Sequence, residues 1–156
     1  MLPQPTAPRE RCHVMEISDV KKRVLETIDR AKRNATERRA RIDEAGREYE
    51  VFLDQVAVPL FRQAANVLRA EGYVFTVFTP GGSVRLMSDR SAQDFIELFL
   101  DTTDDQPRVT GRASRGRGGR VLESEQPIGR PGPVRELTED DVLKFVMKHL
   151  EPFVER

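Results

Sequence analysis

Apolar residues recur at alternating intervals of three and four along residues 14–58, a pattern that predicts one long helix. Eleven of the fourteen positions in this repeat are apolar, so the helix carries a continuous apolar seam. A strict repeat of 3.5 residues per turn is typical of helices that supercoil about another helix. The positions are Val14, Ile17, Lys21, Val24, Ile28, Ala31, Ala35, Arg38, Ile42, Ala45, Tyr49, Phe52, Val56 and Pro59.

The length of this helix favours association with a second chain. About 40 residues span roughly 60 Å, so we expect the helix to extend beyond a compact body of ordinary size and to expose its seam. A homo-oligomer, with a dimer as the first expectation, or a coiled-coil partner would cover it; parallel and antiparallel pairing both stay open. The predicted interface residues are Val24, Ile28, Ala31, Ala35, Ile42, Ala45, Tyr49 and Phe52. The alternative is a helical hairpin that breaks near Asn34 or Gly46.

Pro59 interrupts the helical pattern, because proline lacks the backbone N–H and its ring crowds the preceding turn. We expect a kink or break there, followed by a second helical segment at 60–70 that ends before Gly72. Residues 14–71 therefore form the helical part of the chain.

Short aromatic and β-branched runs separated by turns follow Gly72, which predicts an antiparallel meander of four or five strands. Segment 94–101 could instead form a short helix, because Ser91 and Asp94 fit a capping box. Its two phenylalanines and Ile96 favour a strand. The predicted strands are 73–79, 83–88, 94–101, 108–114 and 120–126.

A C-terminal helix is predicted from Thr138, which fits an N-cap followed by three acidic residues. Its apolar residues share one face that should pack on the sheet: Val142, Phe145, Val146, Leu150 and Phe153. The expected fold class is α+β, with the sheet and this helix in residues 72–156.

Charge balance, cysteine content and the length of apolar runs exclude several classes of protein. The 26 basic residues equal the 26 acidic ones, so no net charge indicates nucleic acid or an anionic membrane. Cys12 is the only cysteine, which excludes an intramolecular disulfide. No run is long and apolar enough for a membrane span or a signal peptide. We expect a cytoplasmic protein with a disordered arm at 1–13, where three prolines fall within eight residues.

Residues suited to catalysis or to metal binding form no specific motif. His13 falls in the predicted arm, and His149 lies near a helix C-terminus, where a positive side chain suits the helix dipole. Glu97, Asp101, Asp104 and Asp105 match no calcium-loop spacing and are interpreted as residues of a solvated turn. The sequence therefore predicts no catalytic residue, no metal and no cofactor, and a protein that is not an enzyme.

Four arginines and three glycines between 112 and 120 form the segment best suited to binding an anion. Arginines supply bidentate donors, and glycines let backbone amides approach a phosphate. No Walker motif is present, and a solvated hairpin tip explains the composition equally well. The candidate residues for an anion or an acidic partner are Arg112, Arg115, Arg117 and Arg120.

The leading functional hypothesis is a non-enzymatic assembly or adaptor protein that oligomerises through its long helix and docks a protein partner. One alternative is nucleic-acid or phosphate binding through the arginine-rich hairpin tip. Another is a small ligand or an enzymatic role in a cleft between the sheet and the C-terminal helix.

Overall fold

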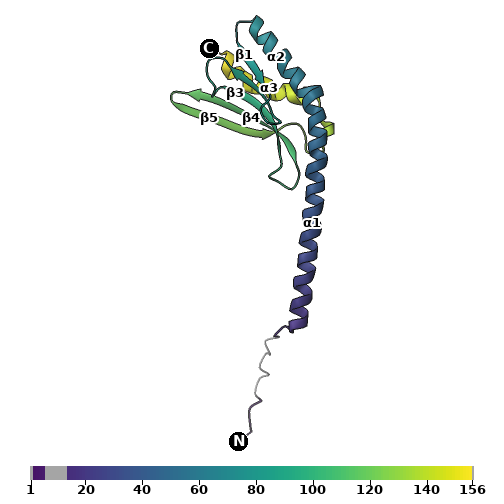
Figure 1. Cartoon of the computed structure of the whole chain (residues 1–156). Coiled ribbons are helices and arrows are strands. Elements are labelled where there is room, and N and C mark those ends of the chain that lie inside the picture. Colours follow the sequence, from purple (N-terminus) through teal and green to yellow (C-terminus); the bar gives the residue numbers. More distant parts are fainter. Residues whose placement is uncertain (1, 6–13, 156) are drawn as a thin grey trace. The chain divides into compact units, whose positions relative to one another are not determined.

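A computed structural model describes residues 2–5 and 14–155 and contains three α-helices and a five-stranded sheet (Figure 1). The predicted α+β fold is confirmed. Most of the predicted disordered arm, including Cys12 and His13, lies outside the described residues. The elements in chain order are α1 (Ile17–Phe52), a π-helical turn (Leu53–Ala57), α2 (Val58–Ala70), β1 (Phe75–Phe78), β2 (Val84–Ser88), β3 (Phe95–Asp101), β4 (Arg108–Arg117), β5 (Arg120–Pro127), a 3-10 turn (Val134–Glu136) and α3 (Glu139–Val154).

The chain divides into two units within α1, one ending at Glu37 and the other beginning at Arg38. In the first unit every described side chain from Val14 onward is exposed. The second unit contains the whole hydrophobic core, which begins at Ala45. The two units are described separately below.

Helix α1 continues through Asn34 and Gly46 without a break, so the hairpin alternative is wrong. The irregularity predicted at Pro59 takes the form of a π-helical turn immediately before it. There the Val58 N–H donates to the carbonyl of Leu53, five residues earlier. Pro59 then falls in the first turn of α2 and, because it has no N–H, donates no hydrogen bond to the preceding turn. The chain is therefore helical from Ile17 to Ala70.

The five strands follow one another in sequence order, and every neighbouring pair is antiparallel. Strand β3 occupies Phe95–Asp101 of segment 94–101, which confirms the predicted strand over the helical alternative. The hairpin between β4 and β5 is tighter than predicted, because only Gly118 and Gly119 separate the strands. Both glycines have positive φ, as the two-residue turns that suit twisted strands require.

One face of the sheet packs against the helices and forms the core. Its buried side chains alternate along the strands, with Val84 opposite Leu98 and Leu86 opposite Ile96. Helix α2 contacts β1 and β2, and α3 contacts β3. A Cβ added at Gly111 would lie 2.3 Å from the ring of Phe145 in α3. Glycine at this position therefore lets α3 approach β4 closely.

Helix α3 begins as predicted. The Thr138 hydroxyl accepts a hydrogen bond from the Asp141 N–H, and the Asp141 carboxylate accepts one from the Thr138 N–H. Four of the five apolar residues predicted to face the sheet are buried, namely Val142, Phe145, Val146 and Phe153, and Leu150 packs at the edge of the core.

Candidate functional site

The predicted interface residues of α1 separate into two groups. Val24, Ile28, Ala31 and Ala35 lie in the first unit and are exposed; Val24 is 50% and Ile28 42% accessible to solvent.

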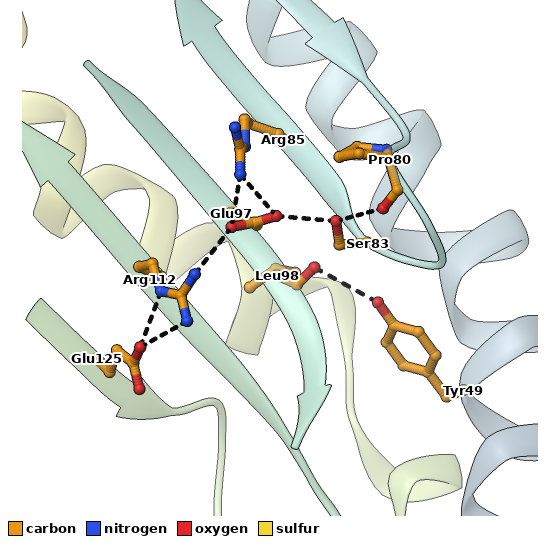
Figure 2. A network of polar contacts seen from close by, with 8 residues as sticks. All are labelled: Tyr49, Pro80, Ser83, Arg85, Glu97, Leu98, Arg112 and Glu125. Carbon is orange, nitrogen blue, oxygen red and sulfur yellow. Dashed lines mark hydrogen bonds and ion pairs between the residues drawn. The ribbon is translucent and has the colours of Figure 1, made fainter. Parts of the chain in front are cut away.

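The remaining interface candidates lie in the second unit. Ala45, Tyr49 and Phe52 are buried in the core of their own chain, and Ile42 is half-buried. The Tyr49 hydroxyl lies 3.4 Å from the Leu98 carbonyl, to which it donates a hydrogen bond (Figure 2). Burial and the nearby Glu97 carboxylate raise the pKa of Tyr49. These core residues are therefore unavailable to a second chain while the domain is folded.

Two further apolar side chains of α1 border the exposed part of the seam. Val20 is 46% and Leu25 50% exposed, and neither belongs to the repeat of three and four. In a heptad whose first position is Lys21, Val20 occupies position g and Leu25 position e, the two positions that border a coiled-coil seam. Counting only the central positions missed them; reading the flanking positions of the same heptads would have found them.

The surface of α1 is strongly basic between residues 21 and 41. The nine basic residues there are Lys21, Lys22, Arg23, Arg30, Lys32, Arg33, Arg38, Arg39 and Arg41, and the three acidic ones are Glu26, Asp29 and Glu37. The segment thus carries a net charge of +6, although the whole chain is neutral. This local excess of charge makes binding of any partner through the segment sensitive to salt.

Arg112 lies in an ion-pair network on the sheet face opposite the core (Figure 2). The network centres on Glu97, whose side chain is only 7% exposed. Glu97 lies 3.2 Å from Arg85 Nη2 and 3.7 Å from Arg112 Nη1, and its Oε1 accepts a hydrogen bond from Ser83 at 2.8 Å. Arg112 also pairs with Glu125 at 2.8 Å. Both of its partners are acidic, so Arg112 is already neutralised within the chain.

Aromatic rings complete this network. The guanidinium carbon of Arg85 lies 4.1 Å from the ring centre of Phe95, and that of Arg112 lies 4.8 Å from the ring centre of Phe99. Cation–π contacts of this kind hold both arginines flat against the sheet. The sequence did not predict that Glu97 pairs with Arg85 on β2 and Arg112 on β4, because only the strand register brings these residues together.

Arg115, Arg117 and Arg120 occupy the other face of the β4–β5 hairpin, by strand alternation from Gly111. Within residues 2–5 and 14–155 none of these three forms an ion pair. The four arginines predicted to act together are thus divided between two faces. The reason is their spacing, since Arg112 is an odd number of residues from Arg115 and from Arg117.

His149 lies in α3 beside a cavity of about 170 Å³ between this helix and the β4–β5 hairpin. Its Nε2 atom is buried and has no hydrogen-bond partner in the part of the chain that the structure describes. Burial and the neighbouring Lys148 lower the pKa of His149. The sequence offered only the helix dipole as a reason for a histidine here, because the cavity is formed by residues distant in sequence.

The acidic turn after β3 has a structural explanation. The Asp101 carboxylate accepts hydrogen bonds from the N–H and the hydroxyl of Thr103, which lower its pKa. No cluster of side chains suited to a metal ion occurs among the described residues. Within those same residues no helix is long and apolar enough to cross a membrane.

Comparison with known protein families, curated proteins and solved structures gives no match to this chain.

Proposed function

We propose that this protein is an assembly protein whose α1 segment, residues 17–38, pairs with the same segment of a second copy. The exposed apolar stripe of this segment carries the proposal. Its members are Ile17, Val20, Val24, Leu25 and Ile28, each between 42% and 87% exposed. Contiguous exposed apolar surface of this kind marks a binding site in most proteins.

A second copy is the partner that fits the heptads best. In a parallel pair, position g of one helix faces position e of the next heptad in the other helix. Val20 of one copy would then meet Leu25 of its partner on both sides of the seam, next to Val24 and Ile28. Four of the seven heptad positions, namely a, d, e and g, are therefore apolar at this end of α1 and would be buried between the two helices.

The charge of α1 opposes pairing of two copies and predicts how association responds to salt. Pairing would bring the basic stretch 21–41 of one copy, with its net charge of +6, next to the same stretch of the other copy, and the two repel each other. Added salt screens this repulsion, so self-association should strengthen between about 50 mM and 500 mM salt. Binding of a nucleic acid to the same basic segment would weaken over that range instead.

The experiment compares Ile28→Asp with Thr36→Asp by light scattering over a range of concentration. Each variant adds one carboxylate to an exposed part of α1, but Thr36 lies outside the seam. Burying an unpaired carboxylate in an apolar seam costs several kcal/mol, so Ile28→Asp should weaken association about a hundred-fold or more. Thr36→Asp should change it less than about three-fold.

Helicity is followed by circular dichroism in the same samples. A wild-type protein that stays monomeric at high concentration and high salt contradicts the proposal, as does equal association of the two variants. A fluorescent DNA duplex added to the wild type tests the competing partner. Duplex binding that weakens with salt, without self-association, would replace the proposal with nucleic-acid binding.

Single cysteines distinguish parallel from antiparallel pairing in a Cys12→Ser background. Residues 28 and 35 both occupy position a, where side chains of parallel, in-register helices approach closely enough for a disulfide. Ile28→Cys and Ala35→Cys should therefore each cross-link with themselves under oxidation. In an antiparallel pair at most one of the two positions can lie opposite itself.

A further inference from the structure

The cavity between α3 and the β4–β5 hairpin belongs entirely to the second unit and is separate from the proposed interface. Its volume is about 170 Å³, and cavities of about 150 Å³ hold a benzene ring. The residues that line it are Ala113, Ser114, Arg115, Leu122, Glu123, Ser124, His149, Pro152 and Phe153.

Strand alternation shows which of these side chains face the helix. Gly111 lies directly under Phe145, and Gln126 accepts a hydrogen bond from Lys148, so both face α3. Side chains two and four residues along the same strands point the same way. On β4 these are Ala113 and Arg115.

On β5, counted back from Gln126, the side chains that face α3 are Ser124 and Leu122. Glu123 lies between these two and points to the opposite face of the sheet. The only carboxylate among the lining residues is therefore directed away from the cavity.

The polar groups that face the cavity are cationic or neutral. Arg115 has no ion pair within the described chain, and Ser124 can donate from its hydroxyl. His149 packs its ring against Phe145 at 4.6 Å and leaves Nε2 buried without a partner among those residues. Because Nε2 is buried, a ligand in the cavity lies beside the ring and does not contact this atom.

The other side chains that face the cavity are apolar. Ala113 and Phe153 are buried, while Leu122 is 47% exposed at the side of the cavity. Pro152 completes this wall from α3. A fully hydrated anion such as phosphate gains nothing from such a wall, whereas the hydrocarbon part of an organic acid does.

We propose that this cavity binds a small organic carboxylate about the size of benzoate. The carboxylate pairs with the Arg115 guanidinium, which presents two parallel donors. The hydrocarbon part lies against Leu122, Pro152 and Phe153. The His149 ring, which also lines the cavity, lies beside the bound carboxylate.

Protonation of His149 makes the affinity for the carboxylate depend on pH. The cationic groups near the ring are Arg115 from β4 and Lys148 from α3, and Glu123 of β5 faces away. Burial and Lys148 lower the pKa of His149, so the free protein holds it neutral at pH 7. A carboxylate beside the ring favours the protonated form of His149 and raises that pKa. Affinity should therefore increase as the pH falls below neutral.

NMR of the histidine ring protons tests the proposal directly, with benzoate as the probe and benzamide as its neutral analogue. A His149→Gln variant assigns the signals, because His13 is the only other histidine. Benzoate should shift the His149 signals saturably and raise the pKa read from them by half a unit or more. Benzamide should bind at least ten-fold more weakly.

Two arginines of the same sheet face provide matched variants. Arg115→Gln removes the guanidinium in the cavity and should weaken benzoate binding ten-fold or more. Arg117→Gln removes a neighbouring exposed guanidinium outside the cavity lining and should change binding less than two-fold. Circular dichroism checks that both variants fold.

Four results would overturn the proposal. They are absence of any His149 shift with benzoate, equal binding of benzoate and benzamide, equal effects of the two arginine variants, and an equal response to inorganic phosphate. The last would show a general anion site without recognition of the organic part.

Discussion

Glu97 is the centre of the ion-pair network on the sheet face opposite the core. Its carboxylate is nearly buried, accepts a hydrogen bond from Ser83 and forms ion pairs with Arg85 and Arg112. Glu125 pairs with the same Arg112 but is half exposed, with 49% of its side chain accessible. The two glutamates therefore allow the effect of burial on an ion pair to be measured within one network.

We expect Glu97→Gln to lower the free energy of unfolding by about 1–3 kcal/mol, because the partly buried Arg85 loses its anion and Arg112 keeps only Glu125. Glu125→Gln should lower it by less than about 1 kcal/mol, since an exposed pair contributes little. Urea unfolding of both variants measures the difference. Similar values for the two variants would mean that burial does not strengthen this network.

Gly111 is the residue whose lack of a side chain brings α3 onto β4. A Cβ there would overlap the ring of Phe145, so Gly111→Ala should destabilise the protein by about 1–3 kcal/mol through overpacking. Gly46 in α1 has nothing within 4 Å of an added Cβ. Gly46→Ala should stabilise the helix by about 0.5–1 kcal/mol. Thermal unfolding should therefore shift in opposite directions, and a parallel shift would contradict this packing.

Among the elements, α3 has the most strongly defined start. The reciprocal hydrogen bonds of Thr138 and Asp141 satisfy two backbone N–H groups that a helix N-terminus leaves free. Thr138→Ala should cost about 1 kcal/mol of stability. Thr36→Ala, within the exposed part of α1, serves as the control and should change stability by less than about 0.5 kcal/mol. Chemical denaturation of both variants tests the cap, and an equal loss would show that the cap contributes nothing.

Helix α1 divides between two roles along its length. From Ala45 to Phe52 its apolar residues complete the core with the sheet. Before Arg38 the same repeat continues with exposed side chains. The repeat is uniform because both helix packing within a domain and pairing between chains use a stripe of nearly the same period.

For the whole molecule, the position of the core predicts which part of the chain folds alone. All core residues lie between Ala45 and Phe153. A protein comprising residues 38–156 should therefore unfold cooperatively, with a urea midpoint close to that of the full chain at low concentration. It should remain monomeric where the full chain associates, as sedimentation would show. Loss of cooperative unfolding would mean that the first unit stabilises the second.

The elements of this protein could be predicted because local patterns specify them. The switch from a period near 3.5 to short alternating runs marks the end of the helices and the start of the sheet, and glycine and proline mark the turns. The threonine before three acids marks α3. Each signal depends on residues a few positions apart, so it needs no knowledge of the fold.

The sites could not be predicted in the same way, because they depend on residues that only the fold brings together. Strand register places Arg112 beside Glu97 and Glu125, whereas alternation along β4 puts Arg115 on the opposite face of the sheet. Packing of α3 on β4 leaves the cavity beside His149. For α1, the sequence by itself determined a continuous apolar seam. Only the tertiary structure decided that Ala45, Tyr49 and Phe52 are buried within the chain while Val24 and Ile28 stay exposed, because burial depends on which surfaces the fold brings into contact.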